Sequence, residues 1–510
     1  MSSRLKVLAA AVAVVACAAV PSVAAADDVV VTSFDATPIV VHPYPGTTGS
    51  AAPTVLLGPG YGSPGAKVGD AFVQGLLAQG YNVVTWDPRG FGVSGGTVNI
   101  DDPLIEGRDT SAIIDWIAQQ PWAQLDGPND PRLGMAGGSY GAGIQYATAA
   151  NDHRIDALTP IVGWHTLETA LYKDQTFKQG WNGLLYFSGK SAAENDGLAG
   201  GAAGVQTGGL DPHIGDAYTA AVGTGKLRPE DLAWFRGRGP GEANLTKITA
   251  PTLVIGGTVD TLFPLDEDIA IYRNLVGHHV PTKMLWFCGG HGVCHTGTGD
   301  PGGPKDAALA LGSGHVTAAI TAWFAKYLKG DASVSTGPGF EWLADDATWR
   351  SAAAYPAPAG PPVTVTAKGK PKLKIVTGPG SGAATEAKPE VAAKALQVPF
   401  KLARATQLLG PPTLRITYQG KASTKSVRVF AQIVDVKRKL VVGNQVTPIP
   451  MVLDAKKRSV TRPLTPIAAA GLKGGRYVLQ LVSASQVWLP QRAKGSFTAS
   501  KLTLTLPTVR

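Results

Sequence analysis

Ser139 is the residue whose surroundings most clearly suggest chemistry. It lies in Gly137-Gly-Ser-Tyr-Gly141, which fits the G-x-S-x-G pattern of a nucleophile elbow, a sharp turn from a strand into a helix. The positions two before and two after the serine must be small, because the strand and the helix nearly touch at this turn. The pattern therefore predicts an exposed nucleophilic serine.

An acid and a base follow Ser139 in the order serine, acid, histidine, which this kind of site requires. Asp260 comes directly after an apolar strand expected over 252–255, in the loop at its carboxyl end. Three nearby acids are alternatives, but they suit the first turn of the next helix, where carboxylates interact favourably with the helix dipole. These are Asp266, Glu267 and Asp268. Asp260 is the predicted acid.

The predicted base is His291, in the loop after a strand expected over 283–287. Its neighbours, Gly289-Gly-His-Gly292, give the backbone the freedom that a base position uses, which favours His291 over His295. Cys288 and Cys294 flank the same loop, and in an exported protein such a pair is expected to form a disulfide. Two cysteines without a second pair make a poor zinc site, so neither a metal nor a cofactor is expected.

These residues suggest acyl transfer. His291 would take the proton of Ser139, which attacks a carbonyl carbon, while Asp260 orients the imidazole. Two backbone N–H groups should stabilise the oxyanion. One belongs to Tyr140, after the nucleophile, and the other to the loop after the strand at 54–57, where Tyr61 is the expected donor and Gly62 the alternative.

Strands and helices alternate around these motifs, which predicts a mostly parallel sheet covered by helices on both faces, an α/β-hydrolase fold. An opening hairpin is expected over 29–41 and an amphipathic helix over 109–120. The remaining predicted strands are 54–57, 81–86, 133–136 and 155–164. The run 87–95 follows a strand and is assigned a structural role, with Asp87 and Arg89 pairing or bonding loop backbone.

The alternation breaks over about 165–249, which predicts a helical cap inserted above the site. Helical pieces are expected at 167–173 and 229–236. The cap region is rich in aromatic residues, most of which should form its core while a few line the substrate pocket. They are Trp164, Tyr172, Phe177, Trp181, Tyr186, Phe187, Trp234 and Phe235.

The N-terminus has the pattern of a secretory signal peptide. Arg4 and Lys6 precede an apolar run, and Ala24-Ala-Ala26 offers a cleavage site, so residues 1–26 are expected to be removed and the protein secreted. The alternative is a lipoprotein anchored at the cell surface through Cys17. No later segment is long and apolar enough to be a transmembrane helix.

Charge divides the remaining chain. Residues 27–360 hold 19 Lys+Arg against 33 Asp+Glu, a balance of −14, whereas residues 361–510 hold 25 against 4, a balance of +21. Such a shift marks a domain boundary. We expect a catalytic domain over 27–350, a linker over 351–362 and a C-terminal β-sandwich over 363–510.

These motifs together resemble the Xaa-Pro dipeptidyl-peptidase and cocaine esterase family of α/β-hydrolases. The similar residues are Ile114-Asp-Trp116 with Gln120-Pro-Trp122, the serine motif, the loops of Asp260 and His291, Trp323-Phe324 and Leu328-Lys-Gly330. Further similarity at 406–417, 427–436 and 474–481 implies the family's C-terminal jelly-roll sandwich, which carries no triad residue. The resemblance implies hydrolysis of an ester or a peptide bond through an acyl-enzyme.

The alternative function is an envelope- or polymer-binding protein with a vestigial hydrolase domain. The positive C-terminal domain is expected to dock against the acidic catalytic domain and to attach weakly to an anionic cell envelope. Nucleic acid is not an expected partner, because the strands show no aromatic and basic platform. The substrate is a small molecule or a peptide, and the oligomeric state stays open.

Overall fold

The computed structural model describes residues 27–46, 49–198, 207–294, 314–471 and 473–510. The predicted signal peptide, Cys17 and His295 lie outside the described residues. None of the described helices combines the length and the apolarity that a membrane crossing demands.

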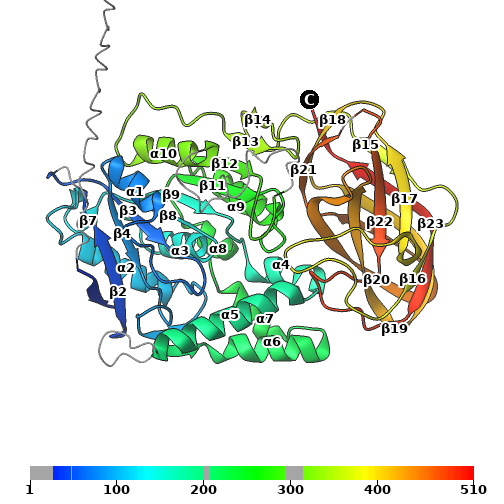
Figure 1. The fold of residues 1–510 in the computed structure, drawn as a ribbon, viewed down its shortest axis with the longest axis horizontal. Helices are drawn as coiled ribbons and strands as arrows, with labels where there is room; N and C mark the ends of the chain where they lie inside the picture. The colour runs from blue at the N-terminus through cyan, green and yellow to red at the C-terminus, as the bar shows by residue number, and fades with distance from the viewer. Residues whose placement is uncertain (1–26, 47–48, 199–206, 295–313, 472) are drawn as a thin grey trace, which may run out of the picture.

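A ten-stranded sheet organises the N-terminal part of the chain (Figure 1). Its order is β1-β2-β4-β3-β8-β9-β11-β12-β13-β14. The opening hairpin of β1 and β2 is antiparallel as predicted, the run from β4 to β13 is parallel, and β14 is antiparallel. The strands are β1 (Val29–Thr32), β2 (Pro38–Tyr44), β3 (Thr54–Gly58), β4 (Asn82–Trp86), β8 (Leu133–Gly138), β9 (Ile155–Ile161), β11 (Thr252–Gly257), β12 (Thr282–Phe287), β13 (Phe340–Leu343) and β14 (Trp349–Ala352).

Helices cover both faces of this sheet. Successive residues of a strand point to opposite faces, and in β3 Leu56 packs into a different apolar core from Val55 and Leu57. The core of Leu56 includes α2 (Glu106–Ile117), α3 (Tyr140–Ala149) and α9 (Leu265–Gly277). The core of Val55 includes α1 (Ala71–Ala78) and α10 (His315–Tyr327).

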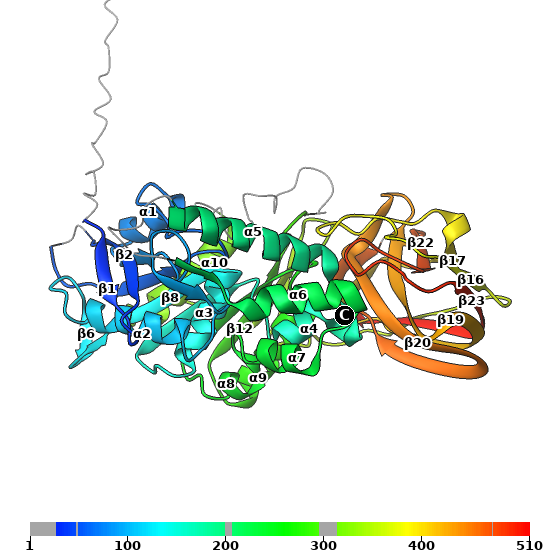
Figure 2. The ribbon, with the colours of Figure 1, turned by 90° about the horizontal axis from the view of Figure 1, so that it is seen from below.

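Five of the described helices form the cap, and three of them were not predicted. The expected pieces are α4 (Leu167–Leu171) and α7 (Pro229–Arg236), and the short α8 (Gly241–Leu245), which was not predicted, follows α7. The other two unpredicted helices are α5 (Gln179–Leu198) and α6 (Pro212–Thr224), which run along one side of the molecule (Figure 2). A cap strand, β10 (Thr207–Leu210), pairs with β5 (Gly96–Val98) of the hydrolase part. Smaller elements are η1 (Lys173–Gln175) and the pair β6 (Leu125–Gly127) and β7 (Asp130–Pro131).

The C-terminal part is built of antiparallel sheets, and the pairings among its strands are all antiparallel. A seven-stranded sheet and a three-stranded sheet share one apolar core. The larger contains β15 (Val363–Thr366), β16 (Lys372–Ile375), β17 (Ala395–Lys401), β19 (Thr413–Asp435), β20 (Leu440–Pro463), β22 (Arg476–Val482) and β23 (Gly495–Leu506). The smaller contains β18 (Thr406–Gly410), β21 (Ile467–Gly471) and β24 (Thr508–Val509), and η3 (Ala392–Lys394) precedes β17.

The C-terminal sheets pack directly against the ten-stranded sheet. Leu409 and Ala468 of the three-stranded sheet belong to the same core as Trp286 and Phe340 of the ten-stranded sheet. Tyr355, in the expected linker, is buried and its ring contacts both of these aromatic rings. Tyr355 and Ala357 thus anchor the segment after β14, while most of its other residues are exposed.

Candidate active site

Ser139 occupies the sharp turn that its motif predicts. It lies between β8 and α3 with φ 57° and ψ −115°, a backbone conformation that residues other than glycine rarely adopt. Its amide donates to the carbonyl of Ile161 over 2.8 Å, which fixes the turn to β9. A Cβ atom on Gly137 or Gly141 would lie 2.5 or 2.2 Å from the carbonyl oxygen of Gly58. The two glycines are therefore required by the close approach of β3, while the serine side chain is not needed for the turn.

Asp260 and His291 lie side by side in the structure. The Asp260 side chain is fully buried, and its Oδ2 lies 2.7 Å from Nδ1 of His291 and accepts the backbone N–H of His291 over 3.2 Å. Its Oδ1 accepts the amides of Leu262 and Phe263 over 2.7 and 3.0 Å. Four donors thus hold the carboxylate in one orientation.

Nε2 of His291 is buried and makes no hydrogen bond to any other described group. The edge of the imidazole packs against Phe263 and Trp181, with ring centroids 5.1 and 5.8 Å apart. Phe263 lines the same cavity as Ser139. A neutral imidazole that donates Nδ1–H to Asp260 keeps Nε2 as a proton acceptor, the form a general base needs.

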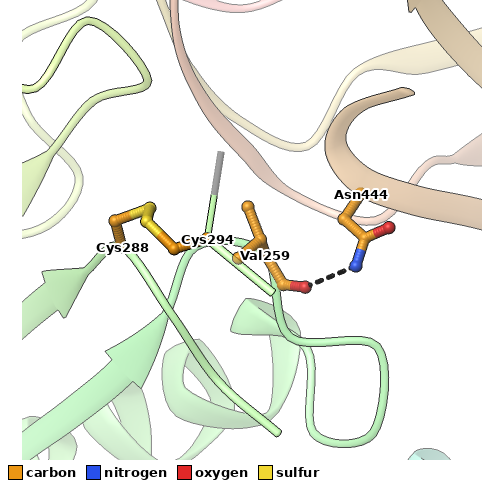
Figure 3. The surroundings of a disulfide bond; sticks show 4 residues. All are labelled: Val259, Cys288, Cys294 and Asn444. Carbon is orange, nitrogen blue, oxygen red and sulfur yellow. Dashed lines mark hydrogen bonds between the residues drawn. A yellow bond between two sulfur atoms is a disulfide. The ribbon is translucent and has the colours of Figure 1, made fainter. Parts of the chain in front are cut away.

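The loop that carries His291 is held by close packing and by a disulfide. Gly290 has φ 140°, and a Cβ atom there would lie 2.5 Å from Cβ of Asp260, so only glycine allows the acid and base loops to approach. Cys288 and Cys294 form a disulfide with Cα atoms 5.3 Å apart (Figure 3). The loop that it closes contains His291. The expected pairing of the two cysteines is thus present in the structure.

The two expected oxyanion donors also lie beside the serine. The Tyr140 amide is the first of helix α3 and has no acceptor within the helix. Within the described ranges, neither this N–H nor that of Tyr61 donates to another backbone group. The ring of Tyr61 packs edge-on against Tyr140 and Phe91, and its hydroxyl lies against Gly189 of α5. The Tyr61 side chain therefore contacts the cap, while its amide stays free.

The cavity next to Ser139 is apolar. Four of the eight cap aromatics line it, namely Trp164, Phe177, Tyr186 and Phe235. The other described lining residues are Tyr61, Ile100, Tyr140, Leu167, Asn182, Leu185, Ile214, Ala217, Tyr218, Leu227, Leu262 and Phe263. In the part of the chain that the structure describes, no charged side chain lines this cavity. An acyl group bound here would meet aromatic rings and aliphatic side chains.

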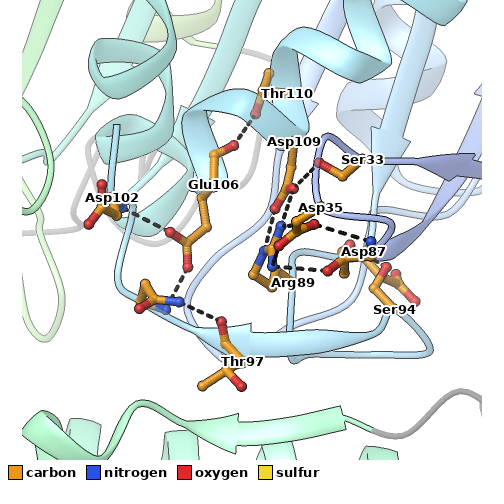
Figure 4. Close-up of polar contacts among 12 residues, drawn as sticks. Ser33, Asp35, Asp87, Arg89, Ser94, Thr97, Asp102, Glu106, Asp109 and Thr110 are labelled. Atoms are coloured by element: carbon orange, nitrogen blue, oxygen red, sulfur yellow. Dashed lines mark hydrogen bonds and ion pairs between the residues drawn. The ribbon is translucent and has the colours of Figure 1, made fainter. Parts of the chain in front are cut away.

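The Asp87 and Arg89 side chains do not pair with each other. Asp87 accepts the amides of Gly65 and Val93 and lies 3.0 Å from Nε2 of His42, so it holds loop backbone as predicted. Arg89 instead bonds two other carboxylates, Asp35 and Asp109 (Figure 4). This network ties the opening hairpin to α2, with Arg89 and Asp109 buried and Asp35 37% exposed.

A further buried acid in the same region, Glu106, binds backbone N–H groups of a neighbouring loop. Its carboxylate accepts the amides of Asn99 and Asp102 (Figure 4). Burial raises the pKa of Glu106 to about 8, and the nearby Asp109 charge adds to the increase. Sequence reasoning missed this residue, because the predicted helix began at residue 109, whereas α2 begins at Glu106.

Comparisons with known proteins identify the family of this chain. Over residues 38–296, slightly more than half of the 510 residues, the sequence matches the profile of X-Pro dipeptidyl-peptidase (S15 family). A quorum-quenching protein of Acinetobacter baumannii is 34% identical over 116 residues, which make up 22% of this chain. That match spans 36% of the relative's own length.

Solved structures resemble almost the whole chain. A CocE/NonD family hydrolase from Staphylococcus aureus is 14% identical with a TM-score of 0.68, covering 94% of this chain and 93% of its own. An aminopeptidase from a marine sediment Thaumarchaeota archaeon is 13% identical with a TM-score of 0.71, and the match covers 95% of this chain and 96% of the aminopeptidase. An α-amino acid ester hydrolase is 12% identical with a TM-score of 0.69, and the match covers 94% of this chain and 96% of the hydrolase. These similarities establish the α/β-hydrolase fold followed by antiparallel β-sheets.

Proposed function

Because the chain belongs to the X-Pro dipeptidyl-peptidase (S15) family and is a hydrolase, we propose that it works through a Ser139, His291 and Asp260 triad. His291 takes the proton of Ser139, which attacks a carbonyl carbon to form an acyl-enzyme. Water then releases the acyl group, with His291 again as base. The observation that carries this proposal is the pairing of Asp260 with His291 beside a cavity lined by an elbow serine.

The amides of Tyr61 and Tyr140 are the proposed oxyanion hole. Each such donor contributes on the order of 3 kcal/mol to transition-state stabilisation. Both belong to residues that line the cavity with Ser139, and both N–H groups are without a backbone acceptor among the described residues.

The substrate we propose is an ester or amide with a neutral, apolar acyl group. An enzyme that removes N-terminal residues must bind a protonated amine, and burying that charge without a partner is costly. The described lining offers only apolar groups, hydroxyls, an indole and the amide of Asn182. Because these polar groups are uncharged, the cavity should bind a neutral acyl group better than the protonated amine of a dipeptide.

Two anilides that differ by one ammonium group test the substrate class. Ala-Pro-anilide and propanoyl-Pro-anilide should be compared at pH 7 together with short acyl esters, by kcat/KM. We expect the propanoyl compound and the esters to be cleaved at least about tenfold better, because a 1.4 kcal/mol difference already gives that factor. A preference for Ala-Pro-anilide would show that a carboxylate reaches the substrate amine and would reverse the assignment.

We also propose that the protein is secreted through its signal peptide and that its C-terminal part is a jelly-roll sandwich within the boundaries given above. The disulfide supports export, since disulfides persist in oxidising compartments.

The positive charge of residues 361–510 supports a weak attachment of the protein to an anionic envelope. Among the described residues, Arg438 and Arg462 are the basic side chains of 361–510 that form ion pairs with acids of the catalytic part, at 2.6 and 3.9 Å. Lys388 and Arg458 pair with acids of the C-terminal part itself, and most of the other lysines and arginines there are exposed.

Attachment by charge should depend on salt. Because the Debye length falls from about 8 Å at 0.15 M to about 3 Å at 1 M, washing intact cells in 1 M salt should release most of the surface-bound protein. Immunoblotting of the wash measures the release. Equal release in low and high salt would leave the positive charge with a role in domain docking alone.

A further inference from the structure

The loop that carries Asp260 is held from outside by the C-terminal β domain. This acid loop, residues 258–263, follows β11 and meets β20 near the disulfide (Figure 3). Two consecutive side chains of β20, Asn444 and Gln445, bond its backbone. Both lie 185 residues further along the chain than the residue they bond, so the contact is a tertiary one between separate parts of the fold.

Asn444 uses its whole amide group in this contact. Nδ2 donates to the carbonyl of Val259 over 3.0 Å and to that of Thr385 over 2.9 Å, while Oδ1 accepts the amide of Ala387 over 2.7 Å. The side chain is completely buried. Its backbone has φ 58°, in the left-handed region that Asn tolerates better than most residues. The local bend of β20 therefore aims the side chain at the acid loop.

Gln445 bonds the acid itself through the backbone. Its Nε2 donates to the carbonyl oxygen of Asp260 over 2.7 Å, and the residue is 6% exposed. The carbonyl groups of Val259 and Asp260 thus both accept from β20, while the Asp260 carboxylate faces His291 on the other side. Holding these carbonyls fixes the peptide planes from which the carboxylate projects.

A second segment of the C-terminal part, residues 384–387, completes the contact. The Thr261 hydroxyl donates to the carbonyl of Ala384 over 3.0 Å and accepts from Nε1 of Trp181, which packs on His291. Thr385 lies against Gly292, where an added Cβ would be 3.0 Å away. The same segment therefore contacts the acid loop and the loop of His291.

We propose that Asn444 and Gln445 are positioning residues for Asp260, so that the C-terminal β domain keeps the acid aligned with His291. This inference rests on the proposed function, because it assigns a role toward the proposed triad. A displacement of about 1 Å in a catalytic group can cost about 100-fold in rate. The C-terminal domain, expected from its family resemblance to carry no triad residue, then still contributes to the geometry of the triad.

The test uses the full-length protein and a fluorophosphonate probe, which needs no knowledge of the substrate. Gln445→Met keeps the length of the side chain and removes the amide, and Asn444→Gly keeps the left-handed backbone and removes the side chain. The matched control is Gln491→Met, since Gln491 donates to the carbonyls of Arg428 and Ser483 within its own domain. Labelling rates are measured across pH, well below the Tm of each variant.

We expect Gln445→Met and Asn444→Gly to lower the second-order labelling rate at least about tenfold, while Gln491→Met stays within about twofold. The acid limb of the pH profile should move to lower pH in the two test variants, because a displaced Asp260 stabilises the imidazolium less. A purely structural role would lower Tm and leave both readouts unchanged.

Wild-type rate and pH profile in either folded test variant would overturn the proposal. Loss of folding in both variants would also overturn it, since docking of the domains would then account for the contact. Absence of labelling in the wild-type protein is a different result, because it contradicts the triad itself.

Discussion

Ser139→Ala should lose hydrolysis by about 10⁶-fold in kcat, the scale found when a triad serine is removed, and should no longer react with a fluorophosphonate. The side chain is the only group lost, since the turn is shaped by Gly137 and Gly141 against Gly58. The variant should therefore fold normally, with an unchanged circular dichroism spectrum and Tm. Turnover of purified protein on the best substrate of the panel measures the loss.

The matched control for this variant is Ser188→Ala, an exposed serine on cap helix α5 whose hydroxyl donates to the carbonyl of Leu185. Its activity and labelling should equal those of the wild type. Retention of more than a few per cent of activity in Ser139→Ala, with the control normal, would assign the nucleophile to another residue. Absence of both turnover and labelling in the wild-type protein would instead favour the alternative in which the hydrolase part is vestigial.

The serine turn and its neighbours could be predicted because their chemistry is local. A tight strand-to-helix turn needs small residues at fixed positions, so Gly137 and Gly141 are visible in the sequence without knowledge of the fold. The parallel strands from β3 to β12 were equally visible as short apolar runs before glycine-rich loops, whereas β13 was not predicted. Asp260 and His291 follow from the same logic, because both come directly after such strands, and the structure brings them within hydrogen-bond distance.

The cap helices were harder to predict from the sequence, because their apolar residues do not recur with a strong helical period. Helix α5 contains Gly180, Gly183 and Gly189, which lower its intrinsic helix propensity, and tertiary packing stabilises it instead. Gly189 is tolerated because the Tyr61 hydroxyl occupies the space of its missing side chain. Helix α6 did carry a signal, since Asp211 caps it and Pro212 occupies its first turn.

Long-range polar contacts could not be predicted from one sequence. Arg89 precedes no acid at a helical spacing, and its partners Asp35 and Asp109 come from a turn and a helix that only the fold brings together. The same holds for Asn444 and Gln445, which lie in a strand that reads as ordinary β structure. A β-strand pattern reveals which residues are buried but not which loop of another domain they meet.

Asp260→Asn should lower kcat by about 10⁴-fold while leaving the protein folded. The amide can still accept the N–H groups of Leu262 and Phe263 through one oxygen. On the other side, an NH₂ group would face Nδ1 of His291, where a carboxylate oxygen now lies at 2.7 Å. An NH₂ donor favours the tautomer with the proton on Nε2, and that nitrogen then no longer accepts the proton of Ser139.

The control is Asp268→Asn, which removes a neighbouring acid in the first turn of α9. Burial raises the pKa of the Asp268 carboxyl well above its ordinary value, with the nearby Asp260 charge adding to the effect. Oδ2 of Asp268 is buried and makes no hydrogen bond to another described group, so an amide of the same shape should change kcat less than tenfold. A near-normal rate in Asp260→Asn, or a larger loss in Asp268→Asn, would place the acid of the triad elsewhere in the loop or helix that follows β11.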